Sequence, residues 1–185
     1  MSDVKKTIDL IDKNQINNFI YLINQVRKNG NTIYLMGNGG SATTASHFCC
    51  DFNKGIMYDK QLEKRFKCIC LNDNISTMLA YANDINYDEI FVQQLKNFLV
   101  DGDLVIGISG SGNSKNVIKA IEYANSIGVD TLSLTGYNGG ILKNISKYSL
   151  HITINNMQIA EDLHLMMFHL ASSILYKTIL KDELV

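Results

Sequence analysis

Five short runs of apolar and β-branched residues, separated by stretches with a helical pattern, constrain the fold of this chain most strongly. Each run is continuously apolar rather than alternating, which is typical of parallel strands buried on both faces. Parallel strands need crossover connections, and these are right-handed and usually helical. The sequence therefore predicts an α/β three-layer sandwich around a five-stranded parallel sheet, with strands at 32–37, 66–71, 103–109, 130–136 and 149–154.

Two long helical segments enclose these strands. Apolar residues recur near helical spacing over residues 4–29, and Gly30 follows as a stop signal. A final helix is expected over residues 158–181, and it is apolar on more than one face. Because no proline, linker or repeat divides the 185 residues, we expect one domain over 1–185, with the helix in 1–30 packing between subunits of an oligomer.

Composition excludes several classes of protein. The formal net charge is −1 and 46% of the residues are apolar, so neither a basic nucleic-acid surface nor a disordered chain is indicated. No apolar run approaches the ~20 residues that a membrane span needs, and no signal-peptide pattern is present. The four cysteines form no C-x-x-C pair, which favours free thiols over a metal–thiolate site. We expect a cytoplasmic protein with no nucleic-acid or membrane partner.

Three glycine-rich loops follow predicted strands: GNGGS at 37–41, SGSGNS at 109–114 and TGYNGG at 135–140. In open parallel sheets, ligands bind at the carboxyl ends of the strands, where these loops lie. Glycines allow backbone N–H groups to converge, and a helix N-terminus directly behind adds donors and a positive dipole end. The loops therefore predict an anion-binding site.

The second loop is the best candidate for holding a phosphate. The hydroxyls of Ser109, Ser111 and Ser114 and the amides of Gly112 and Asn113 are expected to surround it, without a required lysine. A simpler interpretation is that Ser114 or Asn113 only caps the following helix. Three hydroxyls exceed what a cap requires, so we favour the phosphate.

The first loop also allows a different interpretation. GNGGSA at 37–42 satisfies the G-x-G-x-x-G/A dinucleotide fingerprint, and Asp73 after the second strand could bind a ribose. A dinucleotide fold, however, uses one such turn, whereas polar glycine loops follow both the first and the third strand here. No second domain supplies a substrate for hydride transfer, which disfavours this alternative.

Two helices carry a histidine together with a carboxylate. His47 and Asp51 are four residues apart and share a helix face, and Glu161 and His169 lie on the final helix. Either pair could be structural, as a core histidine or an ion pair. Together, two histidines and two carboxylates fit acid–base catalysis or a divalent metal such as zinc. Glu161 and His169 are about 12 Å apart along an ideal helix, so both reach one metal only if their side chains lean toward each other.

Several motifs together resemble the sedoheptulose-7-phosphate isomerases (phosphoheptose isomerases) of the sugar-isomerase (SIS) domain superfamily over nearly the whole chain. They are GNGGSATTASHF, YANDINYDEIF, GISGSGNSKNVIKAI, LTGYNGG and AEDLHLMMFHL. The resemblance implies a flavodoxin-like SIS fold, a homotetramer and Zn²⁺. The implied substrate contacts are Asn38, Gly39, Ser41, Asp84, Ser109, Gly110, Ser111, Ser114 and Glu161. The implied metal ligands are His47, Asp51, Glu161 and His169.

The resemblance also implies a reaction. Members convert sedoheptulose 7-phosphate to D-glycero-D-manno-heptose 7-phosphate through an enediol, the first step of nucleotide-activated heptose synthesis for lipopolysaccharide or capsule. Such an isomerisation needs a base and an acid, and we expect Asp51 and His169 to fill these roles in one order or the other. The alternative is a non-catalytic SIS tetramer that binds a replication initiator or senses phosphosugars, and it would not need this pair.

This chain departs from the family pattern at three positions. Asp51 stands where many relatives have glutamate, Glu161 where they have glutamine, and Gly110 where they have threonine in the phosphate loop. The first change shortens one side chain and the second adds a charge. These departures bear on the choice of substrate and on metal affinity more than on the type of chemistry.

Overall fold

The computed structural model describes residues 2–56 and 64–182, and its centre is one parallel sheet. The five strands lie in the order β2-β1-β3-β4-β5, and every neighbouring pair is parallel. The predicted fold class is therefore confirmed. The strands are β1 Ile33–Gly37, β2 Cys68–Cys70, β3 Leu104–Ser109, β4 Asp130–Thr135 and β5 Tyr148–His151.

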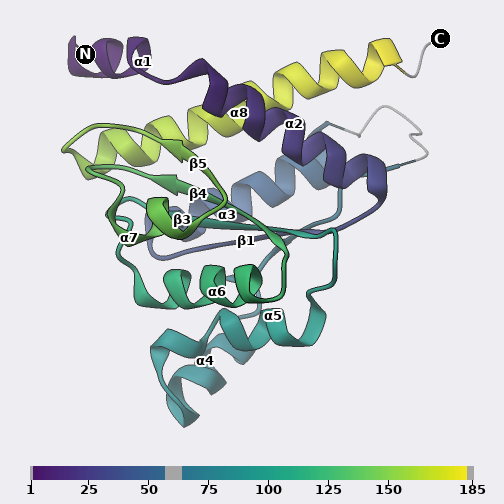
Figure 1. Cartoon of the computed structure of the whole chain (residues 1–185), viewed down its shortest axis with the longest axis vertical. Coiled ribbons are helices and arrows are strands. Elements are labelled where there is room, and N and C mark those ends of the chain that lie inside the picture. The colour runs from purple at the N-terminus through teal and green to yellow at the C-terminus, as the bar shows by residue number, and fades with distance from the viewer. Residues whose placement is uncertain (1, 57–63, 183–185) are drawn as a thin grey trace.

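Helices cover both faces of the sheet (Figure 1). One face lies under α2, α3 and α8, and the other under α5, α6 and α7. The helices are α1 Ser2–Asp9, α2 Lys13–Asn29, α3 Gly40–Cys50, α4 Ile75–Asp84, α5 Val92–Phe98, α6 Lys115–Ser126, α7 Gly140–Ile145 and α8 Met157–Asp182, with a π-helical turn η1 at Asp51–Gly55 and a 3₁₀ turn η2 at Tyr87–Glu89.

Strand side chains alternate between these two layers, as the pleat of a strand requires. In β1, Ile33 and Leu35 join the core under α2, α3 and α8, whereas Tyr34 and Met36 join the core under α5 and α6. All four are buried. The continuous apolar pattern of the strands thus arises because both faces of each strand are covered.

The first predicted helix is two helices. Residues 4–29 were expected to form one, but the chain breaks between Asp9 and Lys13. The Asp12 carboxylate accepts the backbone N–H of Asn14 at 2.8 Å and caps α2, and a side chain that bonds its own backbone in this way favours a new helix start over a continued helix. Gly30 ends α2 in the left-handed conformation, with φ of 76°, as expected of a glycine stop signal.

Helix α8 corrects one expectation. By length and composition it is apolar enough to cross a membrane, whereas no apolar run of that length was expected. A buried core helix of a soluble protein can have the same length and apolar composition as a membrane-spanning helix. Its residues Leu163, Met167, Phe168 and Ala171 belong to the core shared with α2 and α3, which explains the apolar pattern.

Strand β2 lies on one side of β1, and β3, β4 and β5 follow on the other side, so the topological switch point of the sheet lies between β1 and β3. The space beyond the carboxyl ends of these two strands is therefore the expected ligand crevice. The loop after β1 is fastened there by Asn72. Its Nδ2 donates to the carbonyl of Gly37 at 2.8 Å, and its Oδ1 accepts the Gly37 N–H at 3.2 Å. A side chain from the end of β2 therefore holds the start of the GNGGS loop.

Candidate functional site

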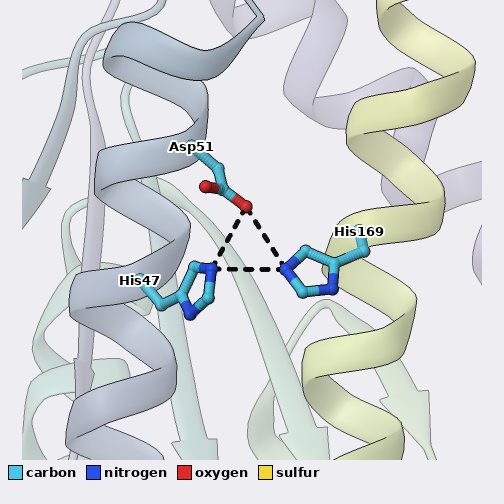
Figure 2. Close-up of side chains that lie close together, drawn as sticks. All are labelled: His47, Asp51 and His169. Carbon is cyan, nitrogen blue, oxygen red and sulfur yellow. Dashed lines mark hydrogen bonds and ion pairs between the residues drawn. The ribbon is translucent and has the colours of Figure 1, made fainter.

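Helix α3, the turn η1 that follows it, and helix α8 bring His47, Asp51 and His169 together (Figure 2). Asp51 Oδ2 lies 3.5 Å from His47 Nε2 and 3.4 Å from His169 Nε2, and the two Nε2 atoms are 3.3 Å apart. All three side chains are partly exposed. Residues 122 positions apart in the chain thus share one small cluster.

The triangle formed by these three atoms fits a tetrahedral cation. A zinc site with bonds of about 2.1 Å places its ligand atoms about 3.4 Å from one another, the length of each edge found here. The donor set of two imidazoles and one carboxylate also suits zinc. Three protein ligands leave a fourth position for water or substrate, as in catalytic zinc sites.

A π-helical turn places Asp51 in this cluster. Helix α3 ends at Cys50, and η1 follows directly. The N–H of Ile56 donates to the carbonyl of Asp51 at 3.0 Å, five residues back, as in a π-helix. Such turns occur frequently at functional sites.

Three buried phenylalanines support the cluster from below. Phe48, Phe52 and Phe168 are the chain neighbours of His47, Asp51 and His169, and each is at most 1% exposed. The rings of Phe48 and Phe52 stack at 3.9 Å between centroids, and Phe168 meets Phe48 edge-on at 4.5 Å. Packing between α3 and α8 therefore determines the distance between the polar side chains above it.

Glu161 lies apart from the cluster. It belongs to the predicted metal set, but its carboxylate packs against Gly40 at the start of α3, where a Cβ on residue 40 would lie 2.5 Å from Glu161 Oε2. Glu161 therefore faces the positive end of α3, and a Cβ at position 40 would displace its carboxylate. Of the four predicted metal ligands, the structure brings three together.

The serine loop presents hydroxyls. Ser109 Oγ and Ser114 Oγ are 2.9 Å apart, and Ser114 occupies the N-cap position of α6 without a side-chain capping bond. The simpler interpretation of Ser114 as a helix cap is therefore not supported. The N–H of Gly112 donates to the Ser109 carbonyl and that of Asn113 to Ser111 Oγ, so these two amides are held within the turn rather than pointing at a ligand.

The TGYNGG loop and the first turn of α7 after it pack against the serine loop. The N–H of Leu142 donates to the Gly112 carbonyl at 2.9 Å, and that of Ile141 donates to Asn113 Oδ1 at 3.2 Å. A Cβ on Gly112 would lie 2.0 Å from the carbonyl oxygen of Gly139. Glycine is required where the two loops touch, and the third loop acts on the site through this contact.

The remaining predicted substrate contacts lie at the start of α3, in the serine loop and at the end of α4. Gly39 has φ of 55° and ψ of −123°, a conformation that favours glycine, and it begins α3 together with the buried Ser41. Gly110 lies against the Met157 thioether, and a Cβ on residue 110 would be 2.2 Å from the Met157 sulfur. Asp84 is exposed at the end of α4 and accepts a hydrogen bond from Asn83, and among the described residues it has no ion pair with the other predicted residues.

Sequence patterns miss two side chains that hold the first loop. Asn72 fastens Gly37, and the buried Asn116 of α6 bonds Asn38. A single asparagine in a loop or helix carries no periodic signal. Both partners lie more than 30 residues away in the chain, so local patterns could not have found them.

His164 lies on the buried side of α8, between Glu161 and His169 in sequence. It is fully buried, and neither ring nitrogen has a hydrogen-bond partner in the part of the chain that the structure describes. Burial lowers the pKa of His164 to about 4. The neutral imidazole is therefore the form that the folded chain accommodates.

This burial predicts a loss of stability in acid. The unfolded chain takes up a proton on His164 near pH 6.5, but the folded chain does so only near pH 4, so stability is complete above pH 6.5 and falls toward pH 4. The contribution is up to roughly 3 kcal/mol. Urea unfolding between pH 7 and pH 4 should show a shallower pH dependence for His164→Leu than for the wild type, and equal slopes would contradict the prediction.

The four cysteines are free thiols, as expected. Cys49, Cys68 and Cys70 are buried and Cys50 is exposed. Burial raises the pKa of Cys70 to about 12 and that of the other two buried thiols further. Within residues 2–56 and 64–182, the cluster of possible metal ligands is the His–Asp–His group, with no cysteine.

Comparison with known proteins gives one consistent family. Residues 1–136 match the family model described as SIS domain. A probable phosphoheptose isomerase from Thermoplasma acidophilum is 35% identical over 168 residues, which cover 91% of this chain and 86% of the relative. A phosphoheptose isomerase from Helicobacter pylori is 37% identical over 151 residues, which cover 82% and 77%.

Solved structures agree. The phosphoheptose isomerase from Neisseria gonorrhoeae aligns with a TM-score of 0.82 and 26% identity, over 92% of this chain and 89% of its own. The phosphoheptose isomerase from Francisella tularensis aligns with a TM-score of 0.86 and 23% identity, over 95% and 92%, and shows the same fold.

Proposed function

The chain belongs to the phosphoheptose isomerases of the SIS domain family, and on this premise we propose that it converts sedoheptulose 7-phosphate to D-glycero-D-manno-heptose 7-phosphate. It is a sugar-phosphate isomerase of the aldose–ketose type. The observation that carries the proposed chemistry is the approach of Asp51 Oδ2 to His169 Nε2, at 3.4 Å, from two separate helices.

The serine loop supports binding of the phosphate end of the substrate. Ser109, Ser111 and Ser114 supply hydroxyl donors, and α6 begins directly behind them with the positive end of its dipole toward the loop. Phosphate binding at a distance from the reacting carbons provides binding energy that positions the sugar chain.

The proposed reaction needs one proton acceptor and one proton donor. One of Asp51 and His169 removes a proton from the carbon next to the carbonyl, and the other protonates the carbonyl oxygen, which gives a cis-enediol. Returning a proton to the other carbon and removing one from the other oxygen completes the isomerisation without any oxidant. The 3.4 Å separation lets both groups reach adjacent atoms of one substrate.

We propose that His47, Asp51 and His169 can also hold a Zn²⁺ ion, since their three ligand atoms match a tetrahedral site. A zinc-bound His169 Nε2 has no proton to exchange, so in the metal-bound form proton transfer would fall to the second oxygen of Asp51. A bound zinc ion would polarise the substrate carbonyl or fix the orientation of these side chains. Glu161 lies outside this cluster and against Gly40, which supports a role for it beside the substrate, near the start of α3.

Titration calorimetry with zinc tests this site. The wild type should bind one ion per chain, and His169→Ala should lose more than about 100-fold in affinity, since even outer partners of a metal site contribute 10- to 100-fold. His151→Ala serves as the matched control, because His151 bonds Thr135 and lies outside the cluster. Equal zinc affinity in wild type and His169→Ala would reject the site.

A coupled assay tests the activity. Purified protein is incubated with sedoheptulose 7-phosphate, and the aldose phosphate formed is measured against a Ser109→Ala/Ser114→Ala variant, which lacks the facing pair of hydroxyls. We expect turnover by the wild type and a large rise in KM in the variant. Absence of aldose product from folded, zinc-loaded protein would reject this substrate.

We propose further that the chain works as a cytoplasmic homotetramer in heptose synthesis for lipopolysaccharide or capsule. Met166, Leu170 and Ile174 repeat every four residues along α8 and are about 40% exposed, which fits an interface beside His169. Residues 1–30 would pack in the same assembly. Light scattering should give four times the chain mass of 20.7 kDa.

A further inference from the structure

Asn38, the residue after β1, is held by a network of side-chain hydrogen bonds. Its Nδ2 donates to Asn116 Oδ1 at 2.9 Å, and Asn116 Nδ2 donates back to Asn38 Oδ1 at 2.9 Å. The Tyr87 hydroxyl donates to the same Asn38 Oδ1 at 3.0 Å. Asn116 is 2% exposed and lies two residues after Ser114, so the network connects the first loop to the start of α6.

The backbone determines which way both amides point. The N–H of Val117 can only donate, and it meets Asn116 Oδ1 at 3.0 Å. The Asn116 atom that meets both the Val117 N–H and Asn38 must therefore be the oxygen, and the other atom, Nδ2, donates to Asn38 Oδ1. The Asn38 atom that receives the Asn116 Nδ2 hydrogen must then be its oxygen. The Tyr87 hydroxyl, which donates to the same Asn38 atom, favours this orientation of the amide as well.

The remaining hydrogen-bonding capacity of Asn38 follows from this orientation. A carbonyl oxygen has two lone pairs, and those of Asn38 Oδ1 are taken by Asn116 and Tyr87. One of the two Nδ2 hydrogens is taken by Asn116. Among the described residues, none accepts a hydrogen bond from the other Nδ2 hydrogen, and the Asn38 side chain is partly exposed at the carboxyl end of β1.

We infer that Asn38 acts on the ligand only as a hydrogen-bond donor, through one N–H, and that Asn116 and Tyr87 are positioning residues that fix this donor. The inference rests on the proposed function, since it takes the ligand to be a sugar phosphate. An acceptor oxygen of the phosphate or sugar chain must meet Asn38. A hydroxyl can meet it only through its oxygen lone pairs, so the network selects the orientation of the ligand.

Kinetics on three variants test the positioning roles. Asn116→Ala and the isosteric Asn116→Asp should each raise KM for sedoheptulose 7-phosphate about tenfold, with a smaller change in kcat, and Tyr87→Phe about threefold, the effect of losing one hydrogen bond. The aspartate fills the same volume and still accepts from Val117, but it cannot donate to Asn38. If Asn116→Asp behaves as the wild type, Asn116 only fills space, and the inference is wrong.

Matched controls separate this effect from general damage. Tyr21→Phe removes a hydroxyl from an exposed tyrosine of α2, and Asn97→Ala removes an exposed amide of α5. Both should keep wild-type KM. Thermal melting of each variant checks folding, and a KM rise in Asn116→Asp without a lower melting temperature supports positioning.

Side-chain amide NMR gives a readout that does not need turnover. Titration of ¹⁵N-labelled protein with inorganic phosphate, and separately with sedoheptulose 7-phosphate, should shift one Asn38 Nδ2 proton downfield and leave the Asn116-bound proton in place. If the wild type is inactive on the sugar but this shift occurs with phosphate, the substrate proposal fails and the inference stands. If the wild type is active and neither ligand moves either proton, the inference fails alone.

Discussion

Asp51→Asn is expected to lower kcat by about 10²- to 10⁴-fold, while binding of the sugar phosphate changes little. The asparagine amide keeps the shape of the side chain but can neither take up nor release a proton at the reacting carbon. Asp51 lies 3.4 Å from His169, so the variant leaves the acid–base pair with one member. The serine loop is unchanged, and with it the phosphate contacts.

Single-turnover assays and direct binding measurements separate these two effects. Zinc content must be measured in the same samples, because Asp51 also belongs to the proposed metal site. Asp162→Asn is the matched control, since it removes a carboxylate from an exposed position of α8 beside Glu161. A purified Asp51→Asn variant with the wild-type rate would show that Asp51 is not the base or acid.

Phe168→Ala is expected to cost about 3–5 kcal/mol of folding free energy, a large fraction of the 5–15 kcal/mol that holds a typical domain folded. The ring is 1% exposed and lies between Phe48, at 4.5 Å, and Phe19, at 5.5 Å. Its removal leaves a cavity between α2, α3 and α8. The neighbouring His169 then loses its fixed distance from His47, so zinc affinity should fall as well.

Urea unfolding and zinc titration measure the two effects of this change. If Phe168→Ala does not fold, Phe168→Leu keeps most of the volume and should cost less than about 1.5 kcal/mol. Phe98→Ala, the same substitution at an exposed position at the end of α5, is the matched control and should lose much less. A Phe168→Ala protein as stable as the wild type would show that the aromatic cluster does not hold the helices together.

Local patterns were sufficient for the sheet and for most helices. The five strands are continuously apolar because both faces are covered, and this signal does not depend on distant residues. Boundaries were less accurate: β2 is shorter than the predicted 66–71, and the first helix divides at Asp12. Such ends depend on single capping bonds, which periodicity does not register.

Part of the site was also predictable. The spacing of four residues between His47 and Asp51 places both on one helix face, and the structure brings their side chains together. Ser109 and Ser114 face each other, and their binding of a phosphate stays a prediction. The position of Glu161 against Gly40 and the use of the Gly112 and Asn113 amides within the turn were not predictable. Both depend on how the chain packs rather than on the residue types.

By itself, the sequence determined the residue chemistry and the order of elements: hydroxyls and glycines after β3, and a histidine on each of α3 and α8. Only the tertiary structure decided that His47, Asp51 and His169 meet at 3.3–3.5 Å, and that Asn116 and Tyr87 turn Asn38 into a donor. The physical reason is range. Periodicity and caps act over a few residues along the chain, whereas these distances are set by buried rings and amides between helices far apart in sequence.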